Sequence, residues 1–370
     1  MERPKVIIFG GIQPTGRHIV AYLVNNQFAS EIRVVDYLHP ANSYFSLEHQ
    51  TILDNVEYLQ LVVDSPETAA RAFHRDDGRP WDYVIQGSFE VRYAMPEAWY
   101  DRHTLAVARN VAEMAAKEGC RVLIHLSNGI AFRYHSSMGQ AMEEDLTEPR
   151  PHIPFSQSVI AAEKAVQVPG IPVVILRCSE FYGPDCLYNF SRFMVFTRLY
   201  GYLQEDYCFP SNRDARVATV HVHDVARAVW HLCKWAEITL SPGTPSLIAP
   251  GAKHMAKTSE MESFSSDGAS SISTNAPSYS LSSVSSSSLP SSIRMNVFSL
   301  FIWASMLKEA GIAQTPLEAQ LFPEEMYQHY YGMDGSKICR ETGFVYEIEK
   351  LTGALALDIV NGWRQRNLLP

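Results

Sequence analysis

A glycine-rich segment near the N-terminus has the residue types that hold phosphate groups. Gly10 and Gly11 directly follow an apolar run, and Gly16 precedes a stretch with helical periodicity. Glycines in such a turn let the chain bend sharply, bring backbone N–H groups close to a pyrophosphate and let the helix pack closely on the strand. This turn between a strand and a helix therefore predicts a dinucleotide-binding site.

A carboxylate follows the turn at the spacing that ribose recognition needs. Asp36 ends the second apolar run, about 20 residues beyond Gly16, where it can accept hydrogen bonds from both hydroxyls of an adenosine ribose. A free 2′-hydroxyl implies NAD in preference to NADP. Asp64 ends the third run and is expected near the adenine. The alternative for Asp36 is an aspartate that only caps a loop.

A parallel sheet must position these residues, because short β-branched runs alternate with longer segments whose apolar residues recur every three or four positions. The sequence predicts strands at residues 5–9, 32–35, 58–63, 83–86, 122–126 and 173–176. It predicts helices at residues 16–25, 66–74, 102–117, 158–168, 224–236, 296–310 and 350–366. The predicted fold class is α/β, a Rossmann-type doubly wound parallel sheet with a smaller C-terminal substrate lobe.

A change in composition divides the second half of the chain. Residues 252–294 are rich in serine and have almost no apolar periodicity, so this segment cannot offset its ordering entropy and is expected to be disordered. Because helical periodicity resumes after it, we interpret it as an insertion. We expect residues 1–177 to form the nucleotide-binding core, and residues 178–251 with 295–370 to form the substrate lobe, which returns one strand to the sheet.

Composition and charge argue against several kinds of partner. The formal net charge of −9 lacks the positive field that binds nucleic acid. No apolar run reaches the roughly 18 residues of a membrane helix, and the N-terminus lacks a secretory signal, so a cytoplasmic protein is expected. The six cysteines include no C-x-x-C pair, which argues against a disulfide framework or a thiolate zinc site. His221 and His223 lack a third ligand at suitable spacing, so no metal is expected.

Several motifs along the chain resemble those of one enzyme family. They are the glycine turn, Asp36, Asp64, Leu126-Ser127, Phe181-Tyr182-Gly183-Pro184 and Val220-His221-Val222-His223-Asp224. In this order they are similar to the extended short-chain dehydrogenase/reductase family, and to its NAD-dependent epimerase/dehydratase group. The resemblance implies bound NAD, a small-molecule substrate and a homodimer formed through the helices at residues 102–117 and 158–168.

The resemblance also locates the family's catalytic positions, and this sequence replaces them. Family members use a tyrosine as acid or base, a lysine four residues later that lowers the tyrosine pKa, and a hydroxyl at the end of the fifth strand. The matching positions here are Phe155, Val159 and Asn128, with Ser127 one residue earlier. Asn128 can donate a hydrogen bond but cannot relay a proton as a hydroxyl does. The ordinary family reaction is therefore in doubt.

The glycine turn departs from the family pattern as well. Gln13 stands where the family's middle glycine lets the pyrophosphate come close, and Pro14 removes an amide donor. Cofactor binding is therefore expected to be weakened or reshaped. The predicted cofactor-binding residues are Gly10, Gly11, Gln13, Gly16, Asp36 and Asp64.

Other side chains in the expected substrate region could carry the proton. Tyr134 is the first candidate, and Tyr93, His135 and His152 are also available. Arg177 could contact an anionic or polar substrate, and its alternative is a buried structural arginine. The predicted substrate contacts are Tyr93, Arg177 and His152. The predicted catalytic set is Ser127, Asn128 and Tyr134.

Three functions are compatible with this sequence. The first is an NAD-dependent epimerase/dehydratase-like oxidoreductase that acts on a small oxygenated substrate, a sugar nucleotide or secondary metabolite, with a non-standard acid/base set. The second is a catalytically degenerate NAD-binding regulatory protein, for which phosphorylation of the serine tract could recruit a partner. The third is a redox-neutral isomerase or lyase that uses the same pocket. The nearly complete set of fold motifs favours the first.

Overall fold

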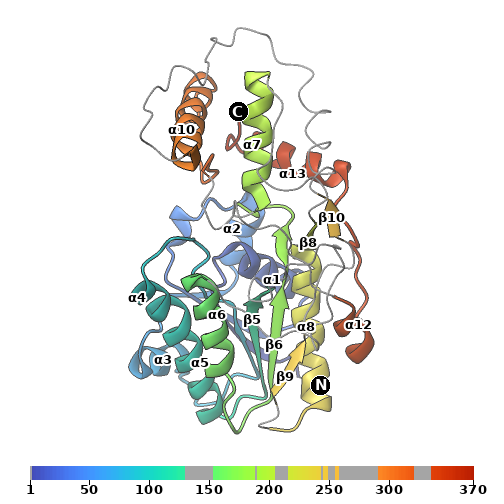
Figure 1. Ribbon diagram of the computed structural model, residues 1–370. Helices are drawn as coiled ribbons and strands as arrows, with labels where there is room; N and C mark the ends of the chain where they lie inside the picture. Colours follow the sequence, from blue (N-terminus) through green and yellow to red (C-terminus); the bar gives the residue numbers. More distant parts are fainter. Residues whose placement is uncertain are drawn as a thin grey trace.

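A seven-stranded parallel sheet forms the centre of the molecule. The computed structural model describes residues 2–129, 153–187, 190–204, 216–242, 245–248, 255–257, 291–320 and 335–370. Within these segments the strand order is β3-β2-β1-β4-β5-β6-β9, and every neighbouring pair is parallel (Figure 1). The strands are β1 (Lys5–Phe9), β2 (Glu31–Asp36), β3 (Glu57–Gln60), β4 (Tyr83–Gln86), β5 (Val122–Asn128), β6 (Val173–Cys178) and β9 (Pro245–Ile248). The order reverses between β1 and β4, which creates a topological switch point at their carboxyl ends.

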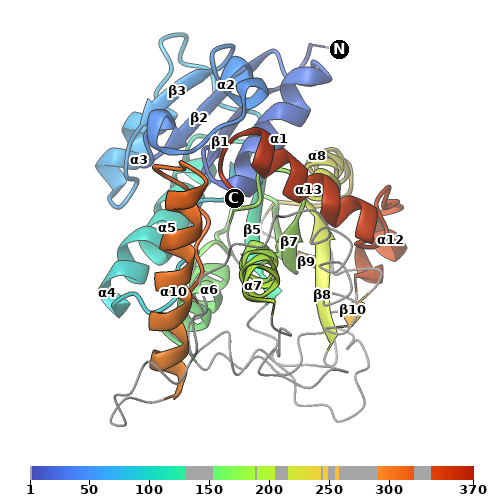
Figure 2. The same cartoon turned by 90° about the horizontal axis from the view of Figure 1, so that it is seen from above.

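Helices cover both faces of this sheet, as Figures 1 and 2 show. On one face lie α1 (Pro14–Asn25) and α8 (Val222–Thr239), and on the other lie α3 (Pro66–Phe73), α5 (Ala106–Lys117) and α6 (Pro154–Ala165). Along β1, Val6 and Ile8 belong to one buried core whereas Ile7 and Phe9 belong to the other, because successive side chains of a strand point to opposite faces. The prediction of a doubly wound α/β fold is confirmed.

The segment between β4 and α5 contains a local irregularity. α4 (Glu97–Tyr100) continues into a π-helical turn, Asp101–Leu105, which then runs into α5. The single helix expected at residues 102–117 therefore has a wider first turn. This turn buries His103 and Thr104, and such turns often occur near functional sites.

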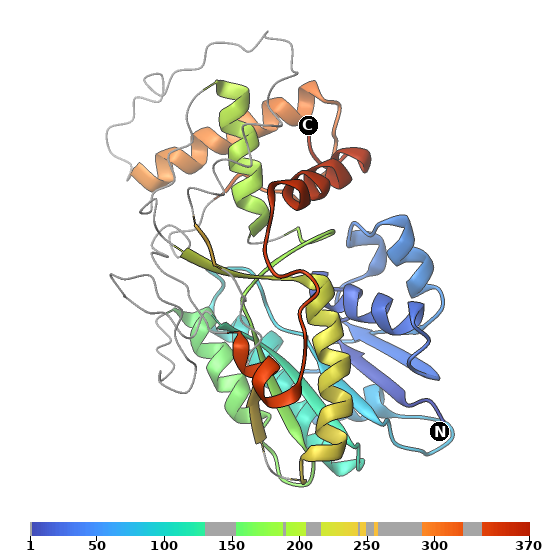
Figure 3. The same ribbon diagram turned by 90° about the vertical axis from the view of Figure 1, so that its right-hand side faces the viewer.

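A smaller lobe lies beyond the carboxyl end of the sheet (Figures 1 and 3). Its three-stranded sheet has the order β10-β8-β7. The elements are β7 (Glu180–Tyr182), α7 (Phe190–Leu203), β8 (Arg216–His221), β10 (Met255–Lys257), α10 (Ser291–Glu309) and α13 (Gly353–Gln365). α12 (Ser336–Thr342) lies instead beside α8, where Ile338 joins the buried core on that face of the main sheet. Leu199, Ile302 and Trp363 bring α7, α10 and α13 into one buried apolar cluster. A short helix, α2 (Leu47–Leu53), lies on the nucleotide-binding side of this junction.

The observed elements differ from the predicted ones mainly at their ends. β3 ends at Gln60, and α6 begins at Pro154 because proline suits the first position of a helix. The expected disorder at residues 252–294 is wrong for Met255–Lys257, which pair with β8 through backbone hydrogen bonds that need no apolar periodicity. α10 also begins inside that range, and the rest of the range lies outside the described residues. In the part of the chain that the structure describes, no helix is long and apolar enough to cross a membrane.

Candidate active site

The glycine turn between β1 and α1 is closely packed. Gly10 has φ +80°, and a Cβ there would lie 2.6 Å from the amide nitrogen of Ser88. A Cβ at Gly16 would overlap the carbonyl oxygen of Gly10, so α1 can approach the turn only because residue 16 is a glycine. Gly11 packs against Val34 of β2. The turn is thus built for close approach of its backbone, as the sequence predicts.

The carboxylate of Asp36 lies directly beside this turn. Its Oδ2 accepts the N–H of Ile12 at 2.9 Å, and its Oδ1 accepts the N–H of Leu38 at 3.0 Å. Burial raises the pKa of Asp36 to about 6, although these backbone donors act in the opposite direction. The backbone N–H groups of Tyr37 and Gln13 act on the same carboxylate, so ribose hydroxyls would share its roughly four acceptor positions with these amides.

The first turn of α1 offers backbone donors for a pyrophosphate. The N–H of Arg17 bonds to the carbonyl oxygen of Gln13 at 2.9 Å and so starts the helix, which leaves the amides of Thr15 and Gly16 without an acceptor inside the helix. Pro14 has no amide to contribute. Gln13 is buried and makes no capping bond with its side chain. The turn therefore offers a pyrophosphate fewer amide donors than an all-glycine turn would.

The position expected for adenine is almost closed. A cavity of only about 10 Å³ lies among Asp36, Val63, Ser88 and His103, enough for roughly one water molecule. The rings of Tyr37 and His103 are 5.3 Å apart across it. A purine could enter only if these rings separate. The backbone amides of the turn and Asp36 are thus the groups that would hold the pyrophosphate and ribose of NAD, whereas the adenine position requires a side-chain movement.

Two residues in this region, His103 and Asp64, contact side chains from α4 and the π-helical turn. His103 stacks on the indole of Trp99 at a centroid distance of 4.2 Å. Asp64 is partly exposed, and its Oδ2 forms an ion pair with Arg102 Nε at 2.6 Å. Asp64 thus lies beyond the third strand as predicted, with a guanidinium as its contact.

Apolar packing surrounds Phe155 and Val159, the two residues that the sequence resemblance aligns with the family's proton donor and lysine. Phe155 is 2% exposed and packs edge-to-face on Tyr93 at 5.4 Å between ring centroids. Val159 is 3% exposed in the same cluster. Tyr93 is itself buried against this cluster, so its described ring contact is one of packing.

The polar residues at the ends of β5 and β6 form a buried ion-pair network. Ser127 Oγ donates to Glu163 Oε1 at 2.5 Å. Arg177 donates to both oxygens of the same carboxylate, from Nη2 at 2.6 Å and from Nε at 2.8 Å. All three side chains are at most 5% exposed. This geometry matches the alternative of a buried structural arginine, and it directs the Ser127 hydroxyl to Glu163.

The remaining predicted site residues divide into two groups. Asn128 is buried at the last position of β5, paired in register with Cys178 of β6. Tyr134, His135 and His152 lie outside the described residues. The structure therefore brings together the turn, Asp36 and the end of β5 along one edge of the sheet, and the proton carrier remains a prediction.

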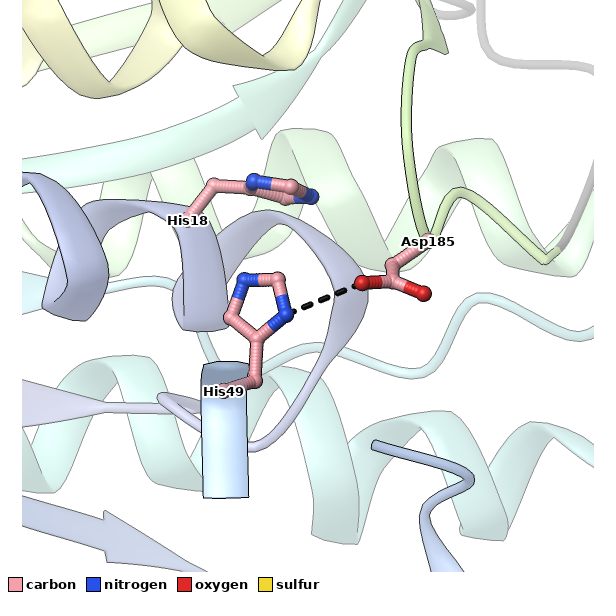
Figure 4. Close-up of side chains that lie close together, drawn as sticks. All are labelled: His18, His49 and Asp185. Carbon is pink, nitrogen blue, oxygen red and sulfur yellow. Dashed lines mark ion pairs between the residues drawn. The ribbon is translucent and has the colours of Figure 1, made fainter. Parts of the chain in front are cut away.

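A second cluster was not visible to sequence reasoning. His18 of α1, His49 of α2 and Asp185, which follows β7, converge beside a cavity of about 750 Å³ (Figure 4). His49 Nδ1 lies 2.9 Å from Asp185 Oδ2, and His18 Nε2 lies 2.7 Å from the carbonyl oxygen of Pro184. Burial lowers the pKa of His49 to about 4. No local motif joins these residues, because they come from three distant segments of the chain.

Comparisons with known proteins agree with this architecture. A sequence profile of the NAD dependent epimerase/dehydratase family matches residues 6–243, whereas no curated protein sequence matches significantly. Among solved structures, WbmG of Bordetella bronchiseptica in complex with NAD and UDP has a TM-score of 0.68 at 15% identity, covering 100% of this chain and 96% of that one. UDP-glucose 4-epimerase of Thermotoga maritima with UDP-glucose has a TM-score of 0.65 at 16% identity, covering 98% and 99%. DesIV, a dTDP-glucose 4,6-dehydratase of Streptomyces venezuelae with NAD and TYD bound, has a TM-score of 0.65 at 16% identity, covering 98% and 97%. At these identities the likeness shows a shared fold.

Proposed function

Because this chain belongs to the NAD-dependent epimerase/dehydratase family, we propose that it is an NAD-dependent oxidoreductase for a small oxygenated substrate, with a proton carrier other than the family's tyrosine. The supporting observation is the 2.9 Å bond between the Ile12 amide and the Asp36 carboxylate, which sets a ribose acceptor beside a phosphate-binding turn. Substrates of the sugar-nucleotide or secondary-metabolite class are proposed because three similar structures hold nucleotides or nucleotide sugars.

Cofactor binding would use the backbone of the turn and one carboxylate. The amides of Thr15 and Gly16 would bind the pyrophosphate, and Asp36 would accept the ribose hydroxyls. When bound, NAD supplies a hydride acceptor at its nicotinamide ring. Tyr37 and His103 would move apart to admit the adenine. Asp64, paired with Arg102, would border the adenine position.

At the end of β5 and the start of α6, the reaction would proceed without a proton donor at the position where the family has its tyrosine. Phe155 and Val159 exclude water there, since both are buried in apolar packing. Asn128 would donate a hydrogen bond to a substrate oxygen, and Ser127 would keep Glu163 in place. Tyr134 would give or take the proton, and His152 would contact substrate.

A second candidate function has a specific observation in its favour. The packing of Phe155 against Tyr93 removes an exchangeable proton from the position where the family needs one. A protein that binds NAD and transfers no hydride would need no such proton. It would act as a regulatory protein or, if the pocket alone performs chemistry, as a redox-neutral isomerase or lyase.

Assembly and location are further parts of this proposal. A homodimer would form through the outer surfaces of α5 and α6, the helices that the family resemblance implies. A cytoplasmic location is consistent with Cys120, Cys178, Cys186, Cys233 and Cys339, which are free thiols in the described segments. Size-exclusion chromatography with light scattering would test the dimer.

Two linked measurements test the function. Calorimetric titration with NAD is expected to show binding, and a panel of sugar nucleotides and hydroxylated metabolites is then expected to yield at least one compound that reduces NAD, followed by the absorbance of NADH. Binding without reduction by any compound would favour the regulatory function. Absence of NAD binding would contradict both the cofactor and the proposed reaction.

A further inference from the structure

A sizeable cavity lies apart from the dinucleotide edge. It has a volume of about 750 Å³ and lies between α1, α2, α8 and α13, where the nucleotide-binding core meets the smaller lobe. None of the predicted catalytic, cofactor or substrate residues lines it. Any ligand in this cavity would therefore be additional to the proposed reaction.

Three potential ligands converge on this cavity from separate segments. His18, His49 and Asp185 each direct a nitrogen or oxygen atom to a common region, and these atoms lie within 4.8 Å of one another. The imidazole rings of His18 and His49 meet edge-to-face with centroids 4.8 Å apart. Figure 4 shows the three side chains pointing toward one another from α1, α2 and the segment after β7.

The charges around the cavity favour a cation. Its lining contains four carboxylates and two guanidinium groups, so negative charges exceed positive ones while the imidazoles are neutral. The carboxylates are Glu48, Asp185, Glu347 and Asp358, and the guanidinium groups are Arg227 and Arg366. Arg227 is already paired with Glu347 at 3.0 Å, and Arg366 with Asp185.

We propose that His18, His49 and Asp185 bind a divalent transition-metal ion of the zinc type. Imidazole nitrogens and one carboxylate oxygen form a donor set that such ions prefer, and three protein ligands leave a position for water from the cavity. The ion takes the place of the His18–Pro184 and His49–Asp185 hydrogen bonds. On each ring the hydrogen of the coordinating nitrogen moves through solvent to the other ring nitrogen, so both imidazoles stay neutral and no net proton is released.

Neighbouring side chains contact two of the proposed ligands, Asp185 and His49. Asp185 shares its carboxylate between the ion and Arg366 of the C-terminal segment, an arrangement that orients the ligand oxygen. Ser46 Oγ lies 2.8 Å from His49 Nδ1, so the ion would also take the place of this contact, while Ser46 still caps α2 through the His49 amide. Because the ligands come from the nucleotide-binding core and from the segment that enters the smaller lobe, the ion holds the two lobes together.

Cobalt provides a direct test, because Co²⁺ occupies zinc-type sites and absorbs visible light. The full chain, freed of metal with a chelator, is titrated with Co²⁺. The proposal expects visible absorption bands that saturate at one equivalent and disappear on adding Zn²⁺. Zn²⁺ at about 100 times its Kd is expected to raise the Tm by roughly 5 °C.

Matched variants assign the ligands. H49Q and D185N are expected to lose the cobalt bands, whereas H223Q keeps them, because His223 lines the same cavity but bonds to Glu347 outside the cluster. X-ray absorption of the zinc-loaded wild type is expected to show a nitrogen and oxygen shell with scattering from two imidazoles, and it needs no variant to fold. Absence of bands in the wild type, bands that persist in a folded ligand variant, or a sulfur shell would each overturn the proposal.

Discussion

The two ends of the sheet's carboxyl edge differ in how closely their residues follow the family pattern. At the cofactor end, recognition depends on backbone amides, glycines and Asp36. Gly10, Gly16 and Asp36 are present, while Gln13 and Pro14 take the place of one glycine and one amide donor. At the substrate end, the family reaction depends on individual side chains, and the residues that the sequence resemblance aligns with two of them, Phe155 and Val159, lie in apolar packing. Backbone N–H groups can hold a ligand whatever side chains the chain carries. Proton transfer depends on a particular side chain and is lost when that side chain is replaced.

Restoring the lost chemistry should produce the largest effect. The double variant F155Y/V159K supplies a proton donor and a nearby ammonium, which together are worth about 10² to 10⁴ in rate when correctly placed. Turnover of a family-type sugar nucleotide, followed by chromatography of its product, is expected to rise by at least 10²-fold. F155Y alone serves as the control and should give less. A folded double variant that shows no gain would mean that α6 does not face the substrate.

Breaking the buried network at the substrate end should mainly affect stability. R177M leaves Glu163 buried and unpaired, so the free energy of unfolding in urea should fall by about 3–5 kcal/mol. R102M removes an exposed partner of Asp64 and should change the free energy of unfolding by less than about 1 kcal/mol. If R177M unfolds like the wild type but raises the KM, Arg177 contacts substrate instead.

At the cofactor end, removing one charge should weaken NAD binding. D36N retains the shape of the side chain but loses a charged acceptor for ribose hydroxyls, and the Kd for NAD should rise about 10- to 100-fold. D64N, whose parent residue pairs with a surface arginine, should alter the Kd only a few-fold. Equal effects of the two substitutions would contradict the assignment of Asp36.

The raised pKa of Asp36 makes the same interaction depend on pH. With a pKa of about 6, the carboxylate is mostly charged at pH 7 and mostly protonated at pH 5, so the Kd for NAD should rise about tenfold over that interval. In the absence of NAD the sign is opposite for folding, because the folded chain keeps this proton at pH values where the unfolded carboxyl, with a pKa near 3.8, has lost it. Calorimetry of D36N should show no such pH dependence.

The smallest effect should come from opening the adenine position. H103A removes one of the two rings that close the cavity, and the cost of separating an aromatic pair is about 0.5–1.5 kcal/mol. The Kd for NAD should therefore fall by up to about tenfold. H74A, which changes an exposed histidine at the end of α3, should leave the Kd for NAD unchanged. Weaker binding by H103A would show that the imidazole contacts the cofactor.

Local sequence patterns were sufficient for the sheet and the turn. The strands that the structure has as β1, β2, β4, β5 and β6 were predictable because each is a short β-branched run, and the glycine turn is contained in seven residues. β9 and β10 were missed as specific strands because they are short and gain their order from partners far along the chain.

The parts of the site that depend on distant contacts could not be predicted in the same way. Arg177 was recognised as polar and near the substrate, but its partner Glu163 comes from another helix. The closure between Tyr37 and His103 depends on the π-helical turn, which has no simple sequence signal. His18, His49 and Asp185 meet only after the sheet, α2 and the segment after β7 have packed.

The stacking of Trp99 on His103 gives the molecule an optical reporter of its own. Indole emission responds to the polarity and contacts of the ring, and this indole also donates to Glu90 Oε2 at 2.5 Å. A purine that displaces the imidazole would change both surroundings, so its arrival would be visible as a change in fluorescence without any added label.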